Sequence, residues 1–111
     1  MADETNETTP APKKAARKPD PMTQLLNDLK AEIKNLGEVS VKMHADSRAP
    51  QYDRRASAWG RHYGQHGTLD GLILSLAFEV LAGLNPAERR YSLVQLAAAA
   101  LVAAEKLEPS K

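Results

Sequence analysis

Three arginines and the chain's single tryptophan lie close together near its middle: Arg54, Arg55, Trp59 and Arg61. Arg54 and Arg61 are seven residues apart, a spacing that places them on one face of a helix, two turns apart. Guanidinium groups hold phosphate in a bidentate way, and an aromatic ring beside them can take a base. These four residues are therefore candidates for binding a nucleotide or a phosphate group. The alternative is a solvated helix face.

Glu79 is the only acidic residue between Asp70 and Glu88, in a segment that is otherwise apolar. An ionised carboxylate in apolar surroundings is costly unless it meets a cation or hydrogen-bond donors. Glu79 is therefore a candidate ligand of a metal ion or part of a phosphate site. The alternative is a place at the edge of a helix, where its carboxylate reaches water or pairs with an arginine.

Two histidines, His62 and His66, are spaced i and i+4, so on a helix they would share a face as metal-ligand pairs do. Gly64 lies between them and weakens the helix, and no glutamate follows His62 as the zinc-protease motif requires. We expect exposed loop histidines, with metal binding as the alternative. The absence of cysteine excludes disulfides, thiol catalysis and cysteine-ligated metal sites.

The net charge is close to zero, with 15 Lys and Arg against 14 Asp and Glu. Such a balance argues against a chain that binds nucleic acid or a membrane surface by charge. The segment 1–20 has too few apolar residues to fold, so we expect a disordered tail. Its later part is basic and could contact phosphate, nucleic acid or an acidic partner. Because no apolar stretch of a secretory signal follows, we expect a cytoplasmic location.

Hydrophobic periodicity and capping residues predict helices over residues 21–36, about 51–62, 69–82 and 86–107. In residues 38–50, apolar and polar residues alternate as in a short strand. No partner strand is visible, so we expect helix or irregular structure there. The predicted fold class is all-α, with a single domain over residues 21–108 built as a small bundle of three to four helices.

The two helices at 69–82 and 86–107 carry more apolar residues than one partner helix can cover. Neither apolar run reaches the roughly 20 residues that a membrane span needs, so we expect no membrane partner. A helix without a polar face lies at the centre of a bundle or at a subunit interface. We therefore expect these two helices to form the core hairpin and to mediate a homo-oligomer.

The order of several short motifs resembles the MazG-like all-α nucleoside triphosphate pyrophosphohydrolases. Trp59-Gly60 comes shortly before His66, as in that family, and two helical segments follow. The sequence Leu-Val-Gln-Leu-Ala-Ala at residues 93–98 is similar to the family's last helix. The resemblance covers about residues 51–107.

This resemblance implies a cluster of carboxylates on two helices that holds magnesium and acts on a triphosphate. Glu79 takes one of the acidic positions, but Phe78 and Ala82 stand where that helix would have two more. Ser92 stands where the last helix would have an acid. We therefore expect a MazG-like helical protein that has lost most of its metal site. It would be an oligomeric binding or regulatory module that still recognises a nucleotide, with magnesium as cofactor only if the site works.

Two other functions stay open. One is an active, metal-dependent nucleoside triphosphate pyrophosphohydrolase with a rearranged site made of Glu79, Asp70 and Glu88. The other is an unrelated small helical interaction protein, such as a phage or chromosomal accessory factor, whose basic tail meets the partner.

Overall fold

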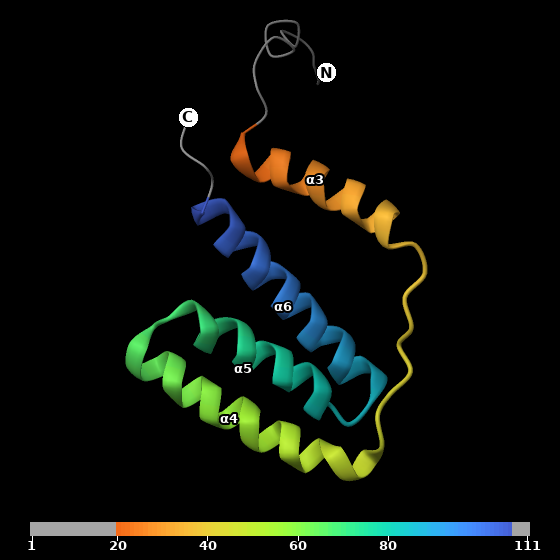
Figure 1. Cartoon of the computed structure of the whole chain (residues 1–111), viewed down its shortest axis with the longest axis vertical. Coiled ribbons are helices and arrows are strands. Elements are labelled where there is room, and N and C mark those ends of the chain that lie inside the picture. Colours follow the sequence, from red (N-terminus) through yellow and green to blue (C-terminus); the bar gives the residue numbers. More distant parts are fainter. Residues whose placement is uncertain (1–19, 108–111) are drawn as a thin grey trace, which may run out of the picture. The chain divides into compact units, whose positions relative to one another are not determined.

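The computed structural model describes residues 20–107, and the expectation of a disordered tail falls almost entirely outside them. The described residues form four α-helices and one short 3₁₀ helix, without a strand. The α-helices are α3 (Pro21–Leu36), α4 (Ala49–His66), α5 (Leu69–Ala82) and α6 (Pro86–Lys106), and the 3₁₀ helix η1 is Asp46–Arg48 (Figure 1). The prediction of an all-α fold is confirmed. Residues 38–45 are irregular, which confirms that the alternating pattern there makes no strand.

The described chain divides into two compact units after Gly37, and each is described by itself. The first unit contains α3, whose N-terminus is capped by Asp20. Its carboxylate accepts a hydrogen bond from the backbone N–H of Thr23 at 2.8 Å, which lowers the pKa of Asp20. The apolar stripe of α3 is exposed, for example at Ile33 and Leu36. The single domain over residues 21–108 stays a prediction.

In the second unit, α4 is longer than the sequence predicts. It continues through Gly60 and Gly64 and ends only at Gly67, whose φ of +64° gives the left-handed conformation that favours glycine. A glycine inside a helix costs about 1 kcal/mol relative to alanine, and packing against α5 offsets this cost. The prediction that His62 and His66 lie in a loop is therefore wrong, since both lie in the last turns of α4.

Helices α4 and α5 pack closely because small residues lie at their contact. Ala56 and Gly71 are the two buried residues of the described chain. A Cβ atom added to Gly71 would lie 2.8 Å from the Cβ atom of Tyr63, so only glycine allows this approach. Further along, the rings of Tyr52 and Phe78 stack at 6.1 Å between centroids.

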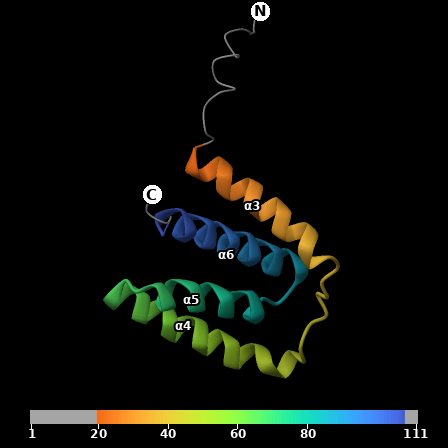
Figure 2. The same ribbon diagram turned by 45° about the horizontal axis from the view of Figure 1, so that its top comes forward.

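Helix α5 lies between α4 and α6 and packs against both (Figure 2). Its more extensive contact is with α4, so the expected hairpin of the last two helices forms but is not the most closely packed pair. At the start of α6, the side chain of Asn85 accepts a hydrogen bond from the N–H of Glu88 at 2.9 Å. The Glu88 carboxylate accepts one from the N–H of Leu84 at 2.9 Å. No helix within residues 20–107 has the length and apolar character required to cross a membrane.

Candidate functional sites

The four candidate phosphate-binding residues all lie on α4, but on two sides of it. Arg54 and Arg61 are exposed and share the face opposite Ala56, which is buried against α5. Arg55 and Trp59 are one turn apart on another side, where the Arg55 guanidinium carbon lies 5.9 Å from the Phe78 ring centroid. The structure therefore places Arg54 and Arg61 on one exposed face, two turns apart, and it directs Arg55 toward α5.

Trp59 is half-buried, and its ring meets the ring of His62 edge-on, with 5.1 Å between centroids. None of the four candidate residues lines any of the three pockets that follow. A phosphate group on Arg54 and Arg61 would therefore lie on an open helix face.

Glu79 lines a pocket of about 490 Å³ formed by the end of α5, the start of α6 and a residue of α4. Two further carboxylates, Asp53 and Glu88, line the same pocket. Glu79 is exposed, as the helix-edge alternative expected, and its carboxylate reaches solvent. This pocket is the acidic pocket below.

Asp70, the third acid of the rearranged-site alternative, lies at the opposite end of α5 from Glu79. It belongs to a polar cluster at the turn between α4 and α5. Its carboxylate accepts hydrogen bonds from the Thr68 hydroxyl and from the Gly71 N–H, the latter at 2.7 Å. The His62 Nε2 atom lies 3.7 Å from the same oxygen. The Thr68 hydroxyl above all, with the Gly71 N–H and His62, lowers the pKa of Asp70.

His62 and His66 do share a helix face, with their ring centroids 4.7 Å apart. The His62 Nε2 atom also lies 3.3 Å from the Thr68 hydroxyl. Within the described residues, no three His, Asp or Glu side chains come together in a way that could hold a metal ion.

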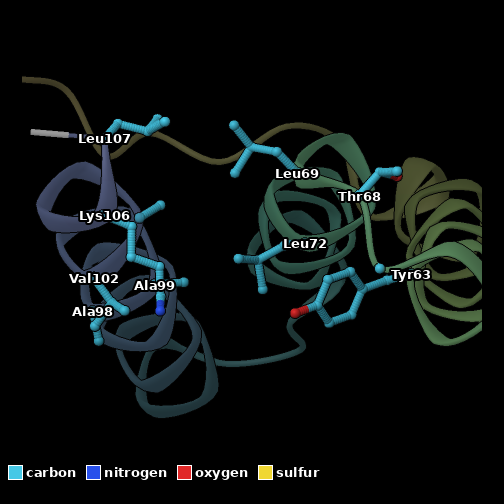
Figure 3. A pocket seen from close by; sticks show the side chains of 11 residues that line it. Tyr63, Thr68, Leu69, Leu72, Ala98, Ala99, Val102, Lys106 and Leu107 are labelled. Atoms are coloured by element: carbon cyan, nitrogen blue, oxygen red, sulfur yellow. The ribbon is translucent and has the colours of Figure 1, made fainter.

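An apolar pocket of about 560 Å³, which sequence reasoning missed, lies at the other end of α5 and α6. Leu69 and Leu72 of α5 point across it toward α6, and the ring of Tyr63 points into the same space from α4 (Figure 3). On α6 it is lined by alanines, by Val102 and by Lys106. The run of alanines at 97–100 was the available signal, since small side chains leave space beside large ones.

A smaller pocket of about 300 Å³ lies where the irregular segment meets the loop between α5 and α6. Met43, His44 and Asp46 line it together with Arg89, whose guanidinium donates to the Gly83 carbonyl at 3.3 Å. The His44 ring contacts Tyr52 edge-on at 4.9 Å, so these contacts fix the entry into α4.

Compared with models of protein families, with curated proteins and with solved structures, this chain gives no match.

Proposed function

We propose that this chain is a MazG-like helical protein that works as an oligomeric binding or regulatory module in the cytoplasm, with a nucleotide as ligand. The observation that carries the proposal is the small amount of burial in the second unit. Ala56 is the one buried apolar side chain among the described residues, at 4 % exposure. Large apolar side chains of α6 such as Val94 and Tyr91 are exposed at 52 % and 66 %.

Exposed apolar surface of this extent favours association. Each Å² of apolar surface removed from water contributes roughly 25 cal/mol, so the exposed side chains of α6 provide a substantial driving force. Contiguous apolar patches on soluble proteins mark interaction sites. We test self-association first, because any purified sample of the protein contains further copies of the same chain.

Light scattering on the full chain over a concentration series tests the oligomer. We expect a mass of at least twice 12.1 kDa at micromolar concentrations and dissociation on dilution. A single mass of one chain at all concentrations would overturn the proposal.

The nucleotide part of the proposal is supported by the pair Arg54 and Arg61 on one exposed face. We expect nucleoside triphosphates to raise the melting temperature of the full chain, and the double variant Arg54→Ala/Arg61→Ala to abolish this shift. The matched control is Arg90→Ala, which removes an exposed arginine from a different helix, α6, and should keep the shift. Equal loss in both variants would show a general charge effect and no site.

The second candidate function, a working metal-dependent pyrophosphohydrolase, is favoured by the acidic pocket. Glu79 and Glu88 line it together, and magnesium in nucleotide sites is held by one or two carboxylates plus the phosphates. The test is pyrophosphate release from nucleoside triphosphates with magnesium or manganese. This candidate requires activity that Glu79→Gln abolishes and Asp70→Asn, at the far end of α5, retains. No release from any triphosphate rejects it.

A further inference from the structure

The two histidines at the end of α4 have no role in the proposed nucleotide site or in the acidic pocket. His62 and His66 are one helical turn apart, and their ring centroids are 4.7 Å apart. The ring planes are inclined by 48°, so the rings are not stacked face to face. His66 is exposed and the side chain of His62 is 38 % exposed, so an ion from solution can reach both rings.

The separation of the two rings matches that of two rings bound to one metal ion. A metal ion lies about 2.0 Å from the nitrogen of a histidine ligand and therefore about 3.2 Å from the centroid of the ring. Two such rings at a right angle around the ion have centroids about 4.5 Å apart, and at the tetrahedral angle about 5.2 Å apart. The observed 4.7 Å is closer to the right angle. Right angles between neighbouring ligands are typical of Cu²⁺ and Ni²⁺, and both ions bind imidazole.

The contacts of His62 determine which of its two nitrogens can bind an ion. The Thr68 hydroxyl donates to the Asp70 carboxylate, so its oxygen can accept a proton from His62 Nε2, which is 3.3 Å away. The Asp70 carboxylate, 3.7 Å from the same nitrogen, also favours a proton there. In the neutral ring the lone pair is then on Nδ1. Metal-binding histidines commonly donate their other N–H in this way, which fixes the ring and increases its basicity.

The electrostatic surroundings of the pair favour a cation. Both histidines lie in the last turns of α4, where the carbonyl end of the helix carries a partial negative charge. The Asp70 carboxylate adds a full negative charge on the first turn of α5. Over residues 20–107 no third His, Asp or Glu completes a set of protein ligands, so water would fill the other positions around the ion.

We propose that His62 and His66 form a two-histidine site for a divalent transition-metal ion of the Cu²⁺ or Ni²⁺ type. An ion bound by both rings joins two successive turns of α4 and stabilises the end of that helix. The contact of His62 with Thr68 holds its ring in the tautomer that binds the ion. This inference is independent of the proposed nucleotide and of the proposed oligomer.

The single tryptophan of the chain reports directly on this site. The ring centroids of Trp59 and His62 are 5.1 Å apart, and Cu²⁺ at so short a distance quenches tryptophan fluorescence. When the full chain is titrated with copper(II) chloride at neutral pH, we expect Trp59 emission to fall and to reach a plateau at one ion per chain. Millimolar magnesium chloride should neither quench the emission nor compete, because Mg²⁺ prefers oxygen ligands. No quenching by Cu²⁺ would overturn the proposal.

His66→Gln is the decisive variant, because it leaves the contact between Trp59 and His62 in place. We expect it to raise the Cu²⁺ concentration at half-quenching at least about tenfold, since the loss of an outer-shell partner alone costs about that much affinity. The matched control is His44→Gln, which removes the third histidine of the chain and should leave the titration unchanged. Equal titrations of His66→Gln and the natural chain would overturn the site, as would an equal loss in His44→Gln.

The melting temperature provides a second measurement, because an ion that binds only the folded chain raises it. Cu²⁺ should raise the melting temperature of the natural chain and of His44→Gln, and it should not raise that of His66→Gln or His62→Gln. Circular dichroism without metal checks that each variant keeps its helices. A shift that persists in both His66→Gln and His62→Gln would place the ion elsewhere and overturn the proposal.

The positioning role of Thr68 is tested through the affinity for the ion. We expect Thr68→Val to weaken Cu²⁺ binding about tenfold, and Thr68→Ser, which keeps the hydroxyl, to restore it. Because Ser and Thr share the hydroxyl, a rescue by Ser separates this contact from the shape of the side chain. Equal affinities of Thr68→Val and the natural chain would overturn the assigned tautomer of His62.

Discussion

The two junctions of α5 differ in how closely the helices approach. At the α4–α5 junction the backbones meet at Gly71, where a Cβ atom has no room beside Tyr63. At the α5–α6 junction the helices leave two pockets of about 560 and 490 Å³ between them. At the first junction, α4 and α5 bury Ala56 and Gly71 within one chain. At the second junction, apolar side chains of α6 stay exposed, and another chain can cover them. Close packing at one side of α5 and open packing at the other therefore distinguish a structural contact from the surface that the proposed association would use.

The largest expected effect is at the closer junction. Gly71→Ala places a methyl group 2.8 Å from the Cβ and 2.9 Å from the Cα atom of Tyr63, so α4 and α5 must separate. Overpacking costs about 1–3 kcal/mol, and the better helix propensity of alanine returns at most about 1 kcal/mol. We expect a net loss of about 1–2 kcal/mol, measured by urea unfolding of the full chain.

The matched control for this loss is Gly60→Ala, since a Cβ atom there meets nothing within 4 Å. If both variants lost the same stability, the comparison between a close and an open junction would be broken.

The N-cap of α6 provides the next largest effect on stability, whereas the N-cap of α5 offers no comparable contact. The Asn85 side chain accepts the Glu88 N–H at 2.9 Å, so Asn85→Ala is expected to cost about 1 kcal/mol. The N-cap of α5, Thr68, makes no capping hydrogen bond with its side chain. Thermal unfolding followed by circular dichroism should therefore show a lower melting temperature for Asn85→Ala. An unchanged value would mean that the start of α6 adds nothing to the folding transition.

A small gain in stability is expected on the exposed side of α4. Gly64 lies inside the helix, and a Cβ atom added to it meets nothing within 4 Å. Gly64→Ala should therefore raise the free energy of unfolding by about 0.5–1 kcal/mol through helix propensity alone. The gain should leave the oligomer mass unchanged in light scattering. A loss of stability would contradict this prediction, because it would mean that the exposed side of α4 does not accept a methyl group at Gly64.

The sequence predicted the helices well where capping residues and periodicity agree, as at Asp20-Pro21 and Asn85-Pro86. It failed at Gly60 and Gly64, because local propensity at a glycine does not include the packing of Ala56 and Tyr63 against α5. The sequence singles out Glu79 as an unusual acid, but the residues that line its pocket come from three helices. Asp53 could therefore not be found from spacing along one helix.

The smallest effect is the pH dependence of the α4–α5 turn. The Thr68 hydroxyl, the Gly71 N–H and His62 lower the pKa of Asp70 in the folded chain, so the folded state binds a proton less readily than the unfolded state. Its contribution to stability is therefore fully present above the ordinary carboxyl pKa, and it is lost as the pH falls through the lowered value.

We expect the melting temperature of Asp70→Asn to depend less steeply on pH between about 5 and 2 than that of the natural chain. Asp20→Ala, which removes both the lowered carboxyl and the N-cap of α3 in the other unit, is the control and should reduce the helicity of α3 instead. Parallel pH profiles of Asp70→Asn and the natural chain would show that the polar cluster contributes nothing to the closer junction. That junction would then depend on Gly71, Ala56 and the aromatic contact alone.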